Sequence, residues 1–145
     1  RPGYTPLENE PQLYDLTCQV VTECFGEDAL VKRGRSTGCT DMGDVSCVMP
    51  TVQPYAPGAS GVGHGSDYCI SDPENAVLLS AQYQVLMAEA LLSNNAELGK
   101  KVIAEAELVY PDKKDYFAAV DKIFLDKKAV TQNEDGTITL DYQNI

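Results

Sequence analysis

The fold of this chain is decided by one stretch, SDPENAVLLSAQYQVLMAEALL, at residues 71–92. Its first four residues predict a helix start, because Ser71 stands three residues before Glu74 in a capping box and Pro73 suits the first turn. The residues that follow are apolar on several faces of a helix, so we expect a long and mostly buried helix. These apolar positions are Val77, Leu78, Ala81, Val85, Leu86 and Leu91.

Three further helices and a few strands are expected around this long helix. The spacing of apolar residues predicts a helix over residues 12–25, with Asn9 as its cap and Gly26 at its end. Helices are also expected over residues 95–109 and 113–126, and strands over residues 29–32, 44–49 and 138–142. The sequence therefore predicts an α/β fold, with a small sheet covered by long helices.

The composition is that of an ordinary globular protein, and its charge excludes some partners. The 145 residues include 11 basic and 22 acidic side chains, and the net charge of -11 argues against binding to nucleic acid or anionic membranes. The longest apolar run, residues 85–92, is too short to span a bilayer and contains Glu89. Five cysteines without a C-x-x-C pair indicate the reduced thiols of a cytoplasmic protein. A first residue of Arg1 rather than methionine fits a piece of a longer protein.

A polar segment at residues 40–46 is the first candidate site. It holds Asp41 and Asp44 three residues apart beside a glycine, at the mouth of the strand expected over residues 44–49. Carboxylates in such a place ligate a metal, orient a metal-bound histidine or accept a hydrogen bond from a substrate. The alternative is that Asp41 caps a turn and Asp44 is solvated.

His64 is the second candidate, because a neutral imidazole is a common ligand of zinc-type ions. Gly63 and Gly65 leave it accessible, although a zinc site needs three or four protein ligands and this chain has one histidine. The alternative is an exposed loop histidine. Nothing marks a neighbouring cysteine as an activated nucleophile.

The tail offers a weaker candidate, a calcium-binding loop. Residues 131–138 resemble the middle of an EF-hand loop, but Thr131 and Tyr142 stand where its first and last carboxylates belong. An Asp135-Gly136 turn that leads into a strand is the better interpretation.

The residues from Cys39 to His64 resemble a known family. CTDMGDVS at 39–46, VMPTVQP at 48–54 and Gly63-His64 are similar to the C-terminal part of the dinuclear zinc amidohydrolases, the family of aminoacylases, carboxypeptidase G and p-aminobenzoyl-glutamate hydrolase. The resemblance implies an α/β/α zinc-peptidase catalytic domain, interrupted by a lid domain through which the parent forms a homodimer. Residues 1–145 would be the segment of the catalytic domain that follows the lid, without the lid and the N-terminal catalytic segment.

The resemblance also implies roles for individual residues. His64 matches the last histidine ligand of one of two zinc ions, while Thr40, Asp41, Asp44 and Gly63 match the wall of the substrate pocket. No catalytic residue is expected here, because the general-base glutamate and the remaining ligands of the family lie upstream. The sequence departs from the family pattern at Cys39, where serine is usual, and has neither H-x-D nor a Glu-Glu pair.

Two functional hypotheses follow. In the first, the chain is the C-terminal part of a zinc-dependent amidohydrolase that cleaves an N-acyl amino acid or a short peptide-like amide. It is then inactive alone, and its partners are the small amide substrate and the missing N-terminal half. In the alternative, the chain is a free-standing acidic binding module without catalytic activity.

Overall fold

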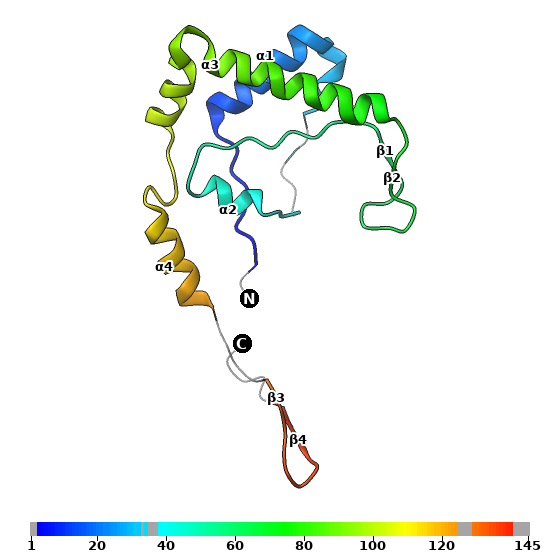
Figure 1. The fold of residues 1–145 in the computed structure, drawn as a ribbon, viewed down its shortest axis with the longest axis vertical. Helices are drawn as coiled ribbons and strands as arrows, with labels where there is room; N and C mark the ends of the chain where they lie inside the picture. Colours follow the sequence, from blue (N-terminus) through cyan, green and yellow to red (C-terminus); the bar gives the residue numbers. More distant parts are fainter. Residues whose placement is uncertain (1–2, 33, 35–37, 125–128, 141–145) are drawn as a thin grey trace.

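The computed structural model describes residues 3–32, 34, 38–124 and 129–140. Helices dominate the fold, and two small antiparallel sheets give it a mixed α/β content (Figure 1). The elements in chain order are α1 (Pro11–Phe25), η1 (Glu27–Ala29), α2 (Met42–Ser46), β1 (Ala59–Ser60), β2 (Cys69–Ile70), η2 (Glu74–Leu79), α3 (Ser80–Glu105), α4 (Lys113–Ile123), β3 (Val130–Gln132) and β4 (Ile138–Leu140).

Helix α1 confirms the helix predicted over residues 12–25. Pro11 occupies its first turn, and the carboxylate of Glu10 caps it by accepting a hydrogen bond of 2.7 Å from the Leu13 amide. The predicted cap, Asn9, was wrong, because its side chain instead accepts from the Gln53 amide at 3.1 Å. Gly26 ends the helix with a φ of 90°, a value that suits glycine.

The long helix of residues 71–92 is confirmed as η2, a π-helical stretch, continuing into α3. Asp72 rather than Ser71 serves its start, accepting from the Asn75 amide at 3.1 Å. Helix α3 is broken at residues 93–96, where three consecutive residues after Ser93 have a positive φ. The chain turns there, as Figure 1 shows, and a second helical segment runs on to Glu105. A separate helix after Asn95 was therefore predicted correctly, but it ends before residue 109.

A small core forms where α1 and α3 pack together. Its buried apolar side chains include Leu13, Val20 and Met87, and the Thr17 hydroxyl lies 2.8 Å from the Tyr83 hydroxyl across the helix interface. The long helix is nevertheless not mostly buried, so that prediction was wrong: α1 covers one side of it and leaves Val85 65% exposed.

Two predicted strands were also wrong. Residues 44–49 form the end of α2 and the turns after it, because the Thr5 backbone lies directly against Gly43 and the amides of Gly43, Asp44 and Val45 bond back to residues 40 and 41. Of residues 29–32, Ala29 ends the 3₁₀ turn η1, where its amide donates to the Gly26 carbonyl at 3.2 Å, and the residues described after it form no strand.

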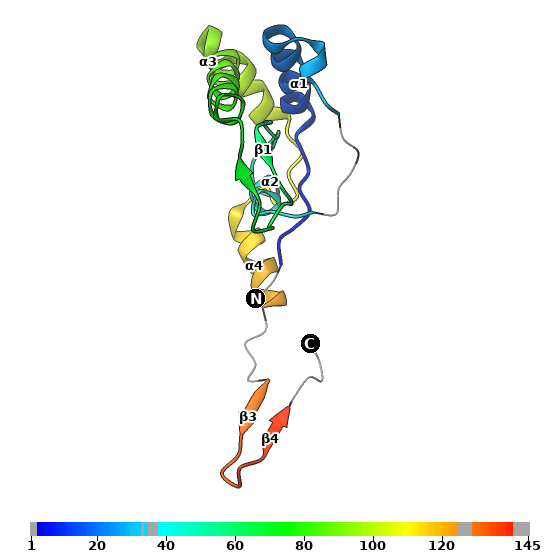
Figure 2. The same ribbon diagram turned by 90° about the vertical axis from the view of Figure 1, so that its right-hand side faces the viewer.

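Both sheets are two-stranded hairpins. In the first, Ala59 pairs with Ile70 and Ser60 with Cys69. In the second, β3 pairs with β4 around the Asp135-Gly136 turn, which confirms the predicted turn and strand up to Leu140. Tyr142, which was expected in that strand, lies outside the described residues. Figure 2 shows the β3–β4 hairpin beyond α4, apart from the packed helices.

The chain exposes much more surface than a compact protein of its mass. Its accessible surface is 11302 Å², whereas a compact monomer of 15.7 kDa exposes about 7,300 Å². The difference of about 4,000 Å² is several times the area of about 800 Å² that one partner buries in a standard protein interface. The arrangement is therefore that of a chain with large uncovered faces.

The stretch Glu74–Glu105 bears on the sequence-based argument against a membrane span. An 18-residue window within these 32 residues has a mean hydropathy of 1.3, so the stretch is long and apolar enough, by length and composition alone, to cross a membrane. The backbone angles of residues 93–96 are not helical, however, so the stretch is two helical segments joined at a kink and not one continuous helix.

Candidate functional site

His64 lies in the loop that joins β1 to β2. Gly61 opens this loop with a φ of 90°, and the Gly65 amide bonds to the Val62 carbonyl at 2.7 Å. The Asp67 carboxylate accepts from the Val62 amide at 3.3 Å and so closes the neck of the loop. His64 is exposed and makes no hydrogen bond with any described residue, so both of its ring nitrogens are open to a ligand.

The backbone of His64 is itself informative. Its φ of 65° is left-handed, a conformation that disfavours a residue with a Cβ by about 1 kcal/mol. Gly63 beside it has open space around it, since no atom lies within 4 Å of the position that a Cβ would take there. Strain of this kind at an exposed polar residue is a reason to look for function there.

Asp44 lies in a half-buried polar cluster at the centre of the molecule. Its Oδ1 accepts from the Thr5 amide at 3.0 Å and from the Thr5 hydroxyl at 2.8 Å. Tyr116 lies near this carboxylate: burial, then the charge of Asp44 and hydrogen bonding with it, raise the pKa of Tyr116. Asp44 therefore joins the N-terminal segment to the start of α4 rather than standing free in solvent.

Thr40 and Asp41, the other predicted pocket residues of this segment, lie just before α2 and have different surroundings from Asp44. The Thr40 hydroxyl donates to Gln53 Oε1 at 3.1 Å and accepts from the Met42 amide at 3.3 Å. The Asp41 side chain is exposed and forms no capping hydrogen bond to α2. Of the two carboxylates, Asp41 is the more exposed to solvent.

The structure gathers these residues into two places, not one. Thr40, Asp41 and Asp44 lie at α2, whereas Gly63 and His64 lie in the β1–β2 loop, which Figure 1 places away from α2. Within the described residues, no three histidine, cysteine, aspartate or glutamate side chains lie close enough to hold a metal ion. His64 fits the role of a single ligand, but these residues do not fit a complete zinc centre.

All five cysteines are free thiols, as the sequence indicated. Cys47 is buried, and its thiol lies 3.4 Å from the Thr5 hydroxyl. Cys24, Cys39 and Cys69 are exposed, and none has a described histidine as a hydrogen-bond partner. A thiol–imidazole nucleophile is thus not assembled in the described part of the chain.

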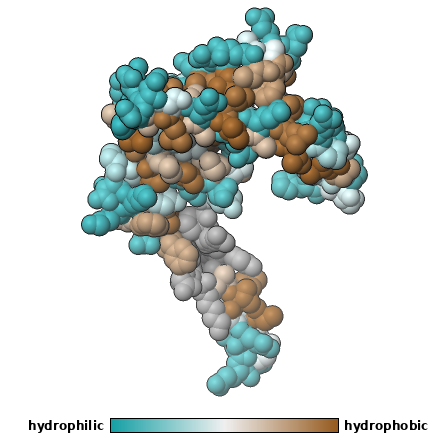
Figure 3. Space-filling view, turned by 45° about the horizontal axis from the view of Figure 1, so that its top comes forward, coloured by the Kyte–Doolittle hydropathy of each residue, from teal (hydrophilic) through white to brown (hydrophobic). Residues whose placement is uncertain are grey.

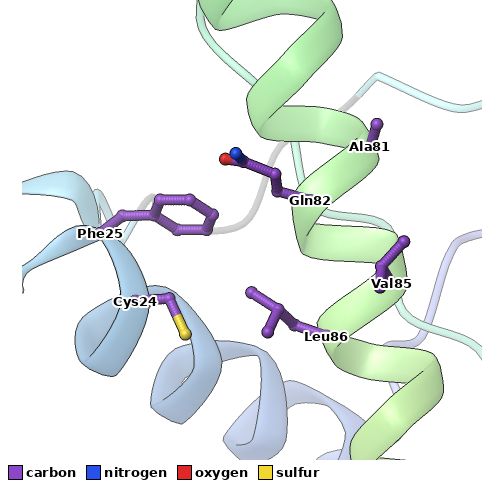
Figure 4. A pocket seen from close by; sticks show the side chains of 6 residues that line it. All are labelled: Cys24, Phe25, Ala81, Gln82, Val85 and Leu86. Atoms are coloured by element: carbon purple, nitrogen blue, oxygen red, sulfur yellow. The ribbon is translucent and has the colours of Figure 1, made fainter.

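An apolar groove between α1 and α3 was missed by sequence reasoning. Its volume is about 620 Å³, and it is lined by Cys24, Phe25, Ala81, Gln82, Val85 and Leu86 (Figure 4). Gln82 and Leu86 point toward α1, while Ala81 and Val85 point away from it. The sequence did hold a signal for this groove: residues 77–92 are apolar on several faces, and a single neighbouring helix such as α1 cannot cover them all.

Comparisons with known proteins add no relative to this picture. No protein-family model matches the chain, and neither the curated proteins nor the solved structures include a match.

Proposed function

We propose that this chain is part of the catalytic domain of a zinc-dependent amidohydrolase, to which it contributes His64, and that it is inactive until further polypeptide completes the site. The order and spacing of residues 39–64 support the family. The single structural observation that carries the proposal is the exposed imidazole of His64, which makes no hydrogen bond with a described residue and is carried on a left-handed backbone.

The uncovered surface supports the need for further polypeptide. The excess of about 4,000 Å² over a compact monomer is too large to attribute to scattered surface residues. It is distributed over apolar side chains of several elements, among them Val85 in α3, Phe117 in α4 and Ile138 in β4. Segments of a larger domain have faces of this kind.

In this proposal the polar cluster at α2 has a supporting role. Asp44 holds the N-terminal segment and α4 together through Thr5 and Tyr116, which fixes the loop that presents Asp41. Asp41 is then the carboxylate available to a substrate or to a neighbouring ligand. When bound, the two zinc ions would polarise the amide carbonyl and lower the pKa of a water.

The test is made in the longer protein that the proposal requires. His64→Ala should reduce the zinc content by about one ion per chain and abolish amide hydrolysis, since a zinc ion with two protein ligands left is weakly held. Ser66→Ala is the matched control, because Ser66 is an exposed residue of the same loop. Zinc is measured by mass spectrometry of the purified protein, and full zinc content in His64→Ala would sink the assignment.

The alternative, an acidic binding module, is favoured by one observation, the apolar groove beside α3. It predicts that ligand binding by the isolated chain is indifferent to His64. Only the amidohydrolase proposal predicts that the zinc content of the longer protein depends on His64.

A further inference from the structure

The loop that carries His64 projects from the body of the molecule. Figures 1 and 3 show the β1–β2 region at the right-hand edge, away from α2 and α4. Its base is fixed at the start of the long helical stretch, because the amides of Ser71 and Asp72 both donate to the Gly58 carbonyl at 3.0 Å. The strands above this base have only two residues each, and an isolated two-stranded hairpin is marginally stable. Residues 61–68 therefore depend on contacts within the loop for their conformation.

The carboxylate of Asp67 lies inside this loop, against both sides of its tip. On one side, its Oδ1 accepts a hydrogen bond of 3.3 Å from the Val62 amide. On the other side, the same oxygen occupies the space beside Gly65, where a Cβ would lie 2.6 Å from it. The Gly65 amide in turn donates to the Val62 carbonyl at 2.7 Å. Since Val62 and Gly65 bracket Gly63 and His64, one carboxylate oxygen holds both ends of the tip.

The two glycines beside His64 differ in what surrounds them. A Cβ on Gly65 would lie within 2.8 Å of the Val62 carbonyl oxygen as well as against Asp67, so this position requires glycine. Gly63, by contrast, has no atom within 4 Å of the position of a Cβ. The packed side of His64 is thus the side of Asp67, and a left-handed φ of 65° persists only where the surroundings hold it.

We infer that Asp67 is a positioning residue for His64. By holding Val62 and Gly65, it keeps the His64 backbone left-handed and so sets the direction in which the imidazole is presented to a ligand. The consequence for zinc rests on the proposed function, whereas the conformation of the loop does not. Groups that orient a metal ligand typically change the metal affinity by about 10–100-fold.

Nuclear magnetic resonance of the 145-residue chain, without metal, is the first test. A residue with a positive φ has its amide and α protons close together, so His64 should show a strong intraresidue NOE between them. In Asp67→Ala this NOE should fall to the intensity of residues with a negative φ, because His64 then relaxes to the favoured backbone regions. Asp67→Asn should retain it, since asparagine keeps an acceptor oxygen at the same place. Ser66→Ala, an exposed position in the same loop, is the matched control and should also retain it.

Three results of this experiment overturn the inference: a weak NOE in the wild type, a strong NOE in Asp67→Ala, or a weak NOE in Asp67→Asn. Gly65→Ala produces the same change by a second route, because its Cβ must displace the Asp67 oxygen. Circular dichroism of each variant shows that its helices are retained. If Asp67→Ala loses them, Gly65→Ala decides.

The zinc dissociation constant of the longer protein separates the role of Asp67 from the proposed function. Asp67→Ala should raise it by about tenfold or more, whereas Asp67→Asn and Ser66→Ala should change it by less than about threefold. If His64→Ala loses zinc and Asp67→Ala binds it as tightly as the wild type, the positioning role is overturned. If His64→Ala keeps its zinc, the proposed function fails, and the NOE alone decides the role of Asp67.

Discussion

Replacing Gly43 by alanine tests the polar cluster that holds the molecule together. A Cβ on Gly43 would lie 2.8 Å from the Thr5 carbonyl carbon and 3.2 Å from that of Pro6, and closer still to the Thr5 oxygen. Ordinary contact begins at 3.4 Å, so the N-terminal segment must withdraw by about 0.6 Å or more. This obstacle is backbone, which cannot rotate aside as a side chain can.

The magnitude follows from what the withdrawal disturbs. Overpacking of this kind typically destabilises by about 1–3 kcal/mol. The two Thr5 hydrogen bonds to Asp44, at 3.0 and 2.8 Å, add about 1 kcal/mol when they lengthen at a half-buried site. We expect a total loss of about 2–4 kcal/mol in the free energy of unfolding, and a melting temperature lower by about 7–13 °C for a chain of this length.

The assay is thermal and urea unfolding followed by circular dichroism. Gly63→Ala is the matched control, because nothing lies within 4 Å of a Cβ at that position, and it should leave stability within about 1 kcal/mol of the wild type. If Gly43→Ala melts as the control does, the N-terminal segment is not held against α2, and our account of Asp44 fails.

Three further predictions concern other parts of the fold. Burial raises the pKa of Tyr83, so the folded state favours the neutral phenol. The free energy of unfolding should therefore fall as the pH rises above 10, and it should fall less in Tyr83→Phe, which has no phenol to ionise. Urea titrations at alkaline pH measure this difference. Hydrogen bonds from Thr137 lower the pKa of Asp135, so the β3–β4 turn should loosen as the pH falls below 4, as amide exchange of Thr137 would report. Ala96→Gly should stabilise the chain by about 0.5–1 kcal/mol in thermal melts, because Ala96 has a φ of 57°. Ala88→Gly, within a regular helical turn, should instead destabilise it by about 1 kcal/mol, and the same sign for both would refute this reading.

The helices could be predicted from sequence because their signals are local. Pro11 and Gly26 bound α1, and Asn95 marks the break in α3. The strand predicted over residues 44–49 was wrong because β-branched and apolar side chains favour a strand when only the local sequence is considered. Their helical turns depend on Thr5, a contact 39 residues away that no local pattern records.

The candidate residues could be named from sequence, but not their arrangement. A loop histidine between two glycines was predicted to be accessible, and His64 is exposed. The residues near Asp44, by contrast, are Thr5 and Tyr116, which are distant from it in the sequence on either side, so the spacing of residues could not predict these contacts. The exposure of α3 was not predicted from the sequence. Apolar residues on several faces show that a helix is able to be buried, but they do not show whether other elements are present to cover it.

The cluster at α2 sets an order of events for the chain as it is synthesised. Helix α2, of five residues, and Cys47 after it are tied backward to Thr5 through Asp44 and forward to Tyr110, whose amide donates to the Cys47 carbonyl at 2.9 Å. Tyr116 lies near Asp44 as well. A helix of that length is not stable on its own in water. Its contacts with Thr5 are available as soon as α2 itself is synthesised, whereas those with residues 110 and 116 form only after the start of α4 has left the ribosome. The polar centre of the molecule is therefore completed in two stages.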